Sequence, residues 1–111
     1  MTVTDRVEQG VTIVAIEGEL DGKSAPEAQQ AIVPLVPADG KLLIDMHGVP
    51  YMSSAGLRMM LLLYRQAVAK GSVVALVGLS EEIEDTMSAT GFLDFFTVVG
   101  SVASGIDLLN A

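Results

Sequence analysis

Two adjacent serines, Ser53 and Ser54, are the strongest candidates for functional chemistry in this sequence. They lie between a short apolar run and a segment with the apolar spacing of a helix. A serine at such a junction caps the helix when its hydroxyl accepts a hydrogen bond from a backbone N–H two or three residues later. We expect Ser54 to be this cap, with Gly56 or Leu57 as the donor.

Gly56 falls inside the first turn of the predicted helix, where glycine is locally unfavourable. Its presence indicates close approach by another backbone or another molecule, or simply tight packing. The same helix carries an unusual pair of apolar residues, Met59 and Leu62, on the side that we expect to face water. Together with Arg58, which lies on that side, they predict a docking surface next to Ser54.

A catalytic interpretation of Ser54 has little support. His47, the chain's one histidine, lies near Asp45, which allows a Ser-His-Asp arrangement to be drawn. The serine segment, however, lacks the first glycine of a nucleophile elbow. We expect the His47 ring to be hydrogen-bonded locally and the protein not to be an enzyme. With no cysteine and no calcium-loop pattern, we expect no metal site, and with no Walker motif or GxGxxG we expect no cofactor.

The charge balance restricts the partners. The net charge is −8, and the six Lys and Arg residues do not cluster in the sequence. Such a chain repels nucleic acid and anionic membrane surfaces. A protein partner with a basic face remains possible. Four acidic residues gather at 81–85, either as a solvated start of a helix or as a surface for an arginine-rich partner.

The elements that position these residues follow from periodicity. Residues 3–7 and 11–16 alternate and predict an antiparallel hairpin. Residues 41–46 and 72–77 are continuous apolar runs, typical of strands covered on both faces. The helix between them, at about 55–70, packs on the sheet through one apolar face in our prediction. That face is formed by Leu57, Met60, Leu61, Tyr64 and Val68.

Three further helices and an edge strand complete the prediction. Ser24 starts the first helix, which Pro34 and Pro37 end. Ser80 starts a helix that ends at Gly91, residues 92–99 form an edge strand, and Ser101 starts the last helix. The fold class is α/β, with a mixed, mainly parallel sheet of about five strands and helices mostly on one face. We expect residues 1–111 to form one domain.

The longest apolar run, residues 59–64, is far shorter than the roughly 20 residues of a membrane-spanning helix. The N-terminus lacks the basic and apolar regions of a signal peptide. We therefore expect a cytoplasmic protein without a membrane partner, and nothing in the sequence demands more than a monomer.

Three segments together resemble the STAS domain family, and within it the bacterial anti-sigma factor antagonists. The central one is residues 43–57, LIDMHGVPYMSSAGL, which resembles the family's strand, loop and helix start. The others are residues 18–21, GELD, and the pair Gly91-Phe92. The resemblance covers nearly the whole chain.

The resemblance implies that a partner serine kinase, itself an anti-sigma factor of ATPase-type fold, phosphorylates Ser54. The unphosphorylated antagonist binds this kinase and frees the sigma factor, and a PP2C-type phosphatase restores the serine. Asp21 matches an acidic residue that helps to present the serine. Many family members carry Asp immediately before that serine, where this chain has Ser53, so Ser53 is the alternative site.

A second possibility is a STAS adaptor without a phosphoswitch. The predicted partner-binding residues are Asp21, Ser53, Ser54, Ala55, Gly56, Arg58, Met59 and Leu62.

Overall fold

Alternating residues at the N-terminus form the predicted hairpin. In the computed structural model, which describes residues 1–111, β1 (Thr2–Glu8) pairs antiparallel with β2 (Val11–Glu17). The connection is Gln9-Gly10, and both residues have positive φ angles, 50° and 79°. Two-residue hairpin turns require this backbone conformation because it matches the twist of the strands, and glycine adopts it without strain.

The remaining strands are β3 (Lys41–Gly48), β4 (Val73–Val77) and β5 (Thr97–Val99), and all of them pair in parallel. The strand order is β1-β2-β3-β4-β5, so each strand lies beside its neighbour in sequence. Leu42, Leu43 and Ile44 of β3 are completely buried, which confirms that this run is covered on both faces.

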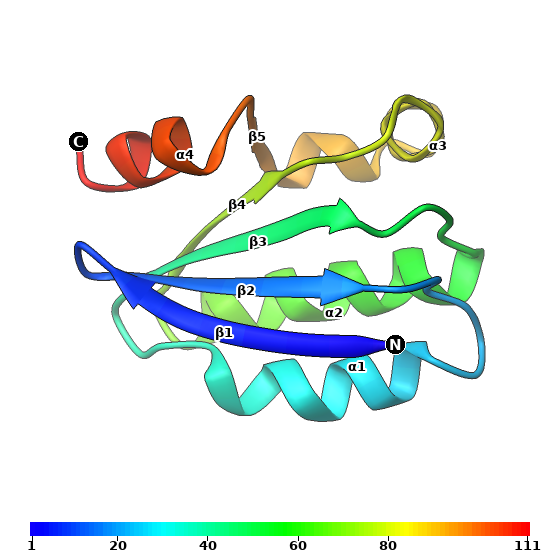
Figure 1. Cartoon of the computed structure of the whole chain (residues 1–111), viewed down its shortest axis with the longest axis horizontal. Helices are drawn as coiled ribbons and strands as arrows, with labels where there is room; N and C mark the ends of the chain where they lie inside the picture. The colour runs from blue at the N-terminus through cyan, green and yellow to red at the C-terminus, as the bar shows by residue number, and fades with distance from the viewer.

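Four α-helices cover the two faces of the sheet unequally (Figure 1). Three of them, α1 (Ala25–Ile32), α2 (Ser54–Ala69) and α3 (Glu81–Ala89), contribute to one core of 22 buried residues. The fourth, α4 (Val102–Leu109), packs on the opposite face over a second core of six. The predicted α/β class, with helices mostly on one face, is confirmed. None of the helices combines the length and apolar character needed to cross a lipid bilayer.

The strand predicted at residues 92–99 is wrong over its first half. Residues Phe92–Phe95 form a 3₁₀ helix, and only Thr97–Val99 pair with β4. The aromatic side chains explain the difference. The rings of Phe95 and Phe96 lie 5.6 and 5.5 Å from the Tyr64 ring of α2, so this segment folds onto α2 instead of extending along the sheet. Gly91, with φ of 77°, ends α3 as predicted.

The buried face of α2 is rotated from the predicted one. Val68, assigned to the core, is 55% exposed, whereas Met59, assigned to the solvent side, is 4% exposed. The cause is α1, which packs beside α2. It covers a side of α2 that would be exposed to solvent if α2 packed on the sheet alone. The buried residues of α2 are Gly56, Leu57, Met59, Met60, Leu63 and Ala67.

Candidate functional site

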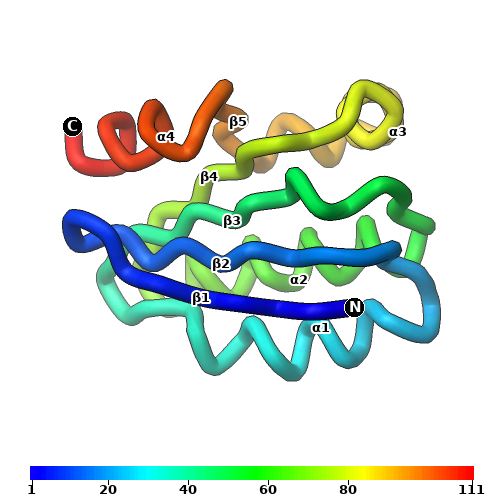
Figure 2. The backbone as a smooth tube through the Cα atoms, viewed as in Figure 1, coloured from blue at the N-terminus to red at the C-terminus, as the bar shows by residue number.

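The loops that follow the adjacent strands β2 and β3 lie side by side (Figure 2). Backbone hydrogen bonds join them. The amide of Gly18 donates to the Gly48 carbonyl at 2.9 Å, and that of Leu20 donates to the Tyr51 carbonyl at 3.0 Å. The amide of Ser53 then donates to the Leu20 carbonyl at 2.8 Å. These bonds place the loop that carries Asp21 beside the start of α2, so the two family-like segments form one surface.

The cap of α2 is Ser53, not Ser54. Ser53 has an extended backbone, with φ −81° and ψ 177°, and its hydroxyl accepts a hydrogen bond from the amide of Gly56 at 3.4 Å. Its bond to Leu20 holds this residue outside the helix, and α2 begins at Ser54, one residue earlier than we expected. Ser54 is therefore the first helical residue, exposed and without a hydrogen bond to its hydroxyl.

Gly56 shows the close approach that its position predicted, and the approaching group belongs to the chain itself. A Cβ atom on Gly56 would lie 2.8 Å from the Leu20 carbonyl oxygen and 3.0 Å from the Leu20 Cβ. Helix α2 can therefore rest against the Leu20 segment only because residue 56 has no side chain.

Asp21 organises the start of α1. Its Oδ1 accepts hydrogen bonds from the amides of Lys23 and Ser24, at 3.0 and 2.9 Å, and the Ser24 hydroxyl accepts from the Asp21 amide at 3.0 Å. The bonds from Ser24 and then Lys23 hold the pKa of the Asp21 carboxyl below its ordinary value. No hydrogen bond joins Asp21 to Ser54, so the structure gives Asp21 a loop-ordering role.

A shallow groove of about 320 Å³ runs between α1 and α2 beside Ser54. The exposed Arg58 lines it, together with Leu62, which is half-buried, and Met59. Met59 is buried, which corrects the prediction that it faces water. Four of the predicted partner-binding residues thus line one groove. Its full lining is Gly22, Ala25, Pro26, Gln29, Ala55, Arg58, Met59 and Leu62.

His47 pairs locally, as predicted. Its Nδ1 lies 2.6 Å from Oδ1 of Asp45, and its backbone amide donates to the same oxygen at 3.0 Å. It makes no hydrogen bond to either serine. No three His, Asp or Glu side chains are grouped so that they could hold a metal ion.

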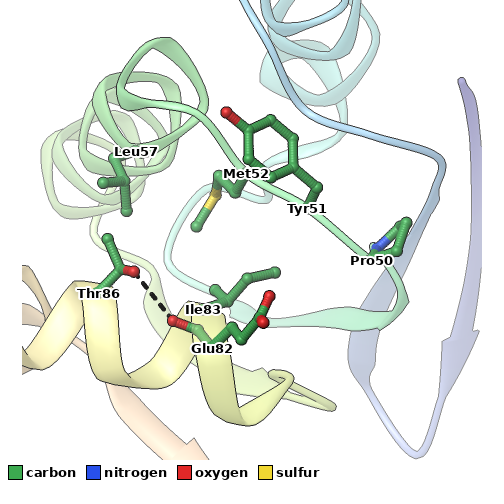
Figure 3. A pocket seen from close by; sticks show the side chains of 7 residues that line it. All are labelled: Pro50, Tyr51, Met52, Leu57, Glu82, Ile83 and Thr86. Carbon is green, nitrogen blue, oxygen red and sulfur yellow. Dashed lines mark hydrogen bonds between the residues drawn. The ribbon is translucent and has the colours of Figure 1, made fainter.

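A second pocket adjoins the serine loop, and the sequence analysis did not find it. It has a volume of about 100 Å³ and lies between the loop before Ser54 and helix α3 (Figure 3). The exposed aromatic Tyr51 and the acidic run on α3 were its only signals in the sequence. The lining residues are Pro50, Tyr51, Met52, Leu57, Glu82, Ile83 and Thr86.

Comparison with known proteins agrees with this architecture. An anti-sigma-B factor antagonist of Bacillus subtilis (strain 168) is 30% identical over 93 residues, which cover 84% of this chain and 85% of that protein. The crystal structure of an anti-sigma factor antagonist from Mycobacterium paratuberculosis has the same fold, with a TM-score of 0.87 at 22% identity. That match covers 99% of this chain and 94% of the other.

The fold also occurs inside a larger protein. Part of the murine anion transporter Slc26a9 matches 91% of this chain with a TM-score of 0.81 and 20% identity, although the match covers only 18% of the transporter. The model of the STAS domain family matches residues 2–105. The chain therefore belongs to the STAS domain family and has distant homology to anti-sigma factor antagonists.

Proposed function

We propose that residues 1–111 act as an anti-sigma factor antagonist switched by phosphorylation of Ser54. The unphosphorylated form binds a serine-kinase anti-sigma factor of ATPase-type fold and thereby releases the sigma factor. Phosphorylation ends this binding, and a PP2C-type phosphatase restores it. One observation carries the proposal: the Ser54 hydroxyl is exposed and unbonded at the start of α2, beside a groove that carries Arg58.

The geometry favours Ser54 over Ser53 as the phosphorylated residue. A kinase needs a hydroxyl that can approach the γ-phosphate in line with the leaving oxygen. The Ser53 side chain is half-buried and accepts the amide hydrogen of Gly56, and phosphorylation there would disturb the helix cap. Ser54 projects from the first turn, where the kinase can reach it without such a loss.

Phosphorylation of Ser54 is expected to act at the interface, not on the fold. A phosphoserine carries a charge of about −1.5 to −2 at neutral pH. The first turn of a helix has unpaired N–H groups and a positive dipole end, so this charge is locally favourable. In the complex, the added bulk and the repulsion from acidic groups in the kinase nucleotide site oppose binding. The proposed contact surface is Asp21, Ser53, Ser54, Ala55, Gly56, Arg58, Met59 and Leu62.

A second candidate function is an adaptor that binds its partner regardless of phosphorylation. The match to part of Slc26a9 supports this candidate, because it shows the same fold inside an anion transporter. Fold alone does not determine function. The adaptor differs from the antagonist in one measurable respect, since its partner binding does not depend on Ser54.

Incubation with ATP and each candidate anti-sigma kinase from the same genome, followed by mass spectrometry, tests the proposal. Phosphate on Ser54 supports the switch and identifies the kinase. Phosphate on Ser53 keeps the protein class and changes the site. Tight binding of a candidate kinase without any phosphorylation favours the adaptor.

The substitution Ser54→Asp tests the switch itself. We expect it to leave the unfolding temperature nearly unchanged, because a carboxylate in the first turn interacts favourably with the helix dipole. We also expect kinase binding to weaken at least about tenfold, or about 1.4 kcal/mol. Isothermal titration calorimetry measures the binding, with Ser54→Ala as the uncharged control. A large loss of thermal stability in Ser54→Asp would contradict our account.

A further inference from the structure

The pocket beside the serine loop has an apolar floor and a polar rim. Met52, Leu57 and Ile83 form the floor, and each is buried, with 7%, 6% and 4% of its surface exposed. These three side chains converge from the loop, α2 and α3 (Figure 3). Glu82 and Thr86 stand on the α3 side of the rim, with the Thr86 hydroxyl donating to the Glu82 carbonyl at 2.9 Å.

The volume of the pocket suits one side chain. At about 100 Å³, it is smaller than a cavity of about 150 Å³ lined by Leu, Ile and Phe, which binds benzene. A branched aliphatic group therefore fits, whereas a large aromatic ring does not. Tyr51, 50% exposed at the edge, adds apolar surface around the opening.

The charge at the rim is negative and uncompensated. Glu82 is exposed and forms no salt bridge, and no Lys or Arg lines the pocket. Glu81 and Asp85 lie on the same helix and are also exposed. A free carboxylate next to an apolar hollow complements an aliphatic side chain that has a cationic neighbour.

The position of the pocket links it to the phosphorylation site. Tyr51 and Met52 precede Ser54 by three and two residues, and Leu57 follows it by three. A kinase that engages Ser54 must therefore lie close to this pocket. Two hollows flank the start of α2: the groove carrying Arg58 towards α1, and the pocket carrying Glu82 towards α3.

We propose that the pocket receives one aliphatic side chain of the kinase anti-sigma factor, and that an adjacent arginine or lysine of the kinase pairs with Glu82. This inference rests on the proposed function and adds a second recognition element to it. The acidic run at residues 81–85 thereby gains a binding role in addition to its favourable interaction with the dipole of α3.

A pair of charge reversals on α3 tests the proposal. Glu82 lines the pocket, whereas Glu84 lies in the same first turn and lines a different hollow. Glu82→Lys and Glu84→Lys change the net charge equally, and both residues lie in the first turn of α3. We expect the kinase Kd to rise at least about tenfold for Glu82→Lys and by less than about threefold for Glu84→Lys. Calorimetric titration against the kinase that phosphorylates or binds the wild-type chain gives both values.

A steric variant tests the apolar half of the pocket. Thr86→Met places a longer side chain over the floor, and we expect a Kd increase of about tenfold, whereas Thr86→Ser leaves the pocket open and the Kd unchanged. Circular dichroism melting curves establish that each variant is folded.

Equal effects of the two charge reversals, or unchanged binding by Thr86→Met, would overturn the pocket proposal. If Ser54 is then still phosphorylated, the proposed function stands without the pocket. If the wild-type chain binds a kinase but is never phosphorylated, the phosphoswitch fails, and the same Kd comparison still decides the role of the pocket.

Discussion

The carboxylate of Asp21 accepts two backbone hydrogen bonds at the start of α1, and these keep its pKa below the ordinary value of 3.8. A folded pKa below the unfolded one means that the charged carboxylate stabilises the native state. This contribution is complete above the unfolded pKa and disappears as the pH falls through the folded pKa.

We expect Asp21→Asn, which keeps an acceptor oxygen but no charge, to be less stable than the wild type at pH 6. The difference should close as the pH falls below 3.8 and through the lower folded pKa, as urea titrations at several pH values will show. A difference that does not vary with pH would contradict this account.

We expect Gly56→Ala to destabilise the protein, although Gly→Ala inside a helix usually stabilises it. Inside a helix, Gly→Ala normally stabilises by about 1 kcal/mol. At this position the new Cβ would collide with the Leu20 carbonyl, and we expect a loss of about 1–3 kcal/mol. Gly22→Ala is the control, because a Cβ there meets no atom within 4 Å. We expect Gly22→Ala to stay within about 0.5 kcal/mol of the wild type in urea unfolding.

The sequence did not predict which of the two serines caps α2. The sequence placed a helix start at Ser53-Ser54, because either residue is a good cap. The choice between them depends on the hydrogen bond from the Ser53 amide to Leu20, which lies more than 30 residues away in the chain. Local patterns carry no information on such a contact, so the cap was assigned one residue too late.

Among the elements, α4 is the only helix that contributes to the smaller core, and Ile106 is its one buried large side chain. Removing this side chain leaves a cavity that no other helix can fill. We expect Ile106→Ala to cost about 2–5 kcal/mol in unfolding free energy. The neighbouring Leu108, 48% exposed, gives the control Leu108→Ala, expected to change stability by less than about 0.5 kcal/mol. A cost for Ile106→Ala as small as that of the control would mean that α4 does not contribute to the stability of the fold.

The elements themselves were largely predictable, and their faces were less so. The hairpin is predicted by the alternation of polar and apolar residues, the central strands by apolar runs, and the helix starts by capping residues. All of these are local signals in the sequence. The buried face of α2 depends on α1 beside it, and the short β5 depends on the tilted and edge-to-face packing of Phe95 and Phe96 against Tyr64. These are tertiary contacts between elements, which periodicity within one element does not encode.

For the molecule as a whole, the net charge of −8 gives a prediction about association. Attraction to a basic partner face accelerates encounter and is screened by salt. We expect the association rate with the kinase to fall about tenfold or more between 50 and 500 mM NaCl. The dissociation rate should change much less, and stopped-flow fluorescence separates the two. A salt-independent association rate would show that the partner face is not basic.

The strand order β1-β2-β3-β4-β5 follows the order of synthesis. As a ribosome extrudes the chain, every new strand finds its pairing neighbour already made, so the sheet can grow at one edge. No strand has to be inserted between two others, and no early edge has to wait for a distant segment. Chains of this topology therefore expose unpaired strand edges only briefly during translation, which limits their opportunity to aggregate.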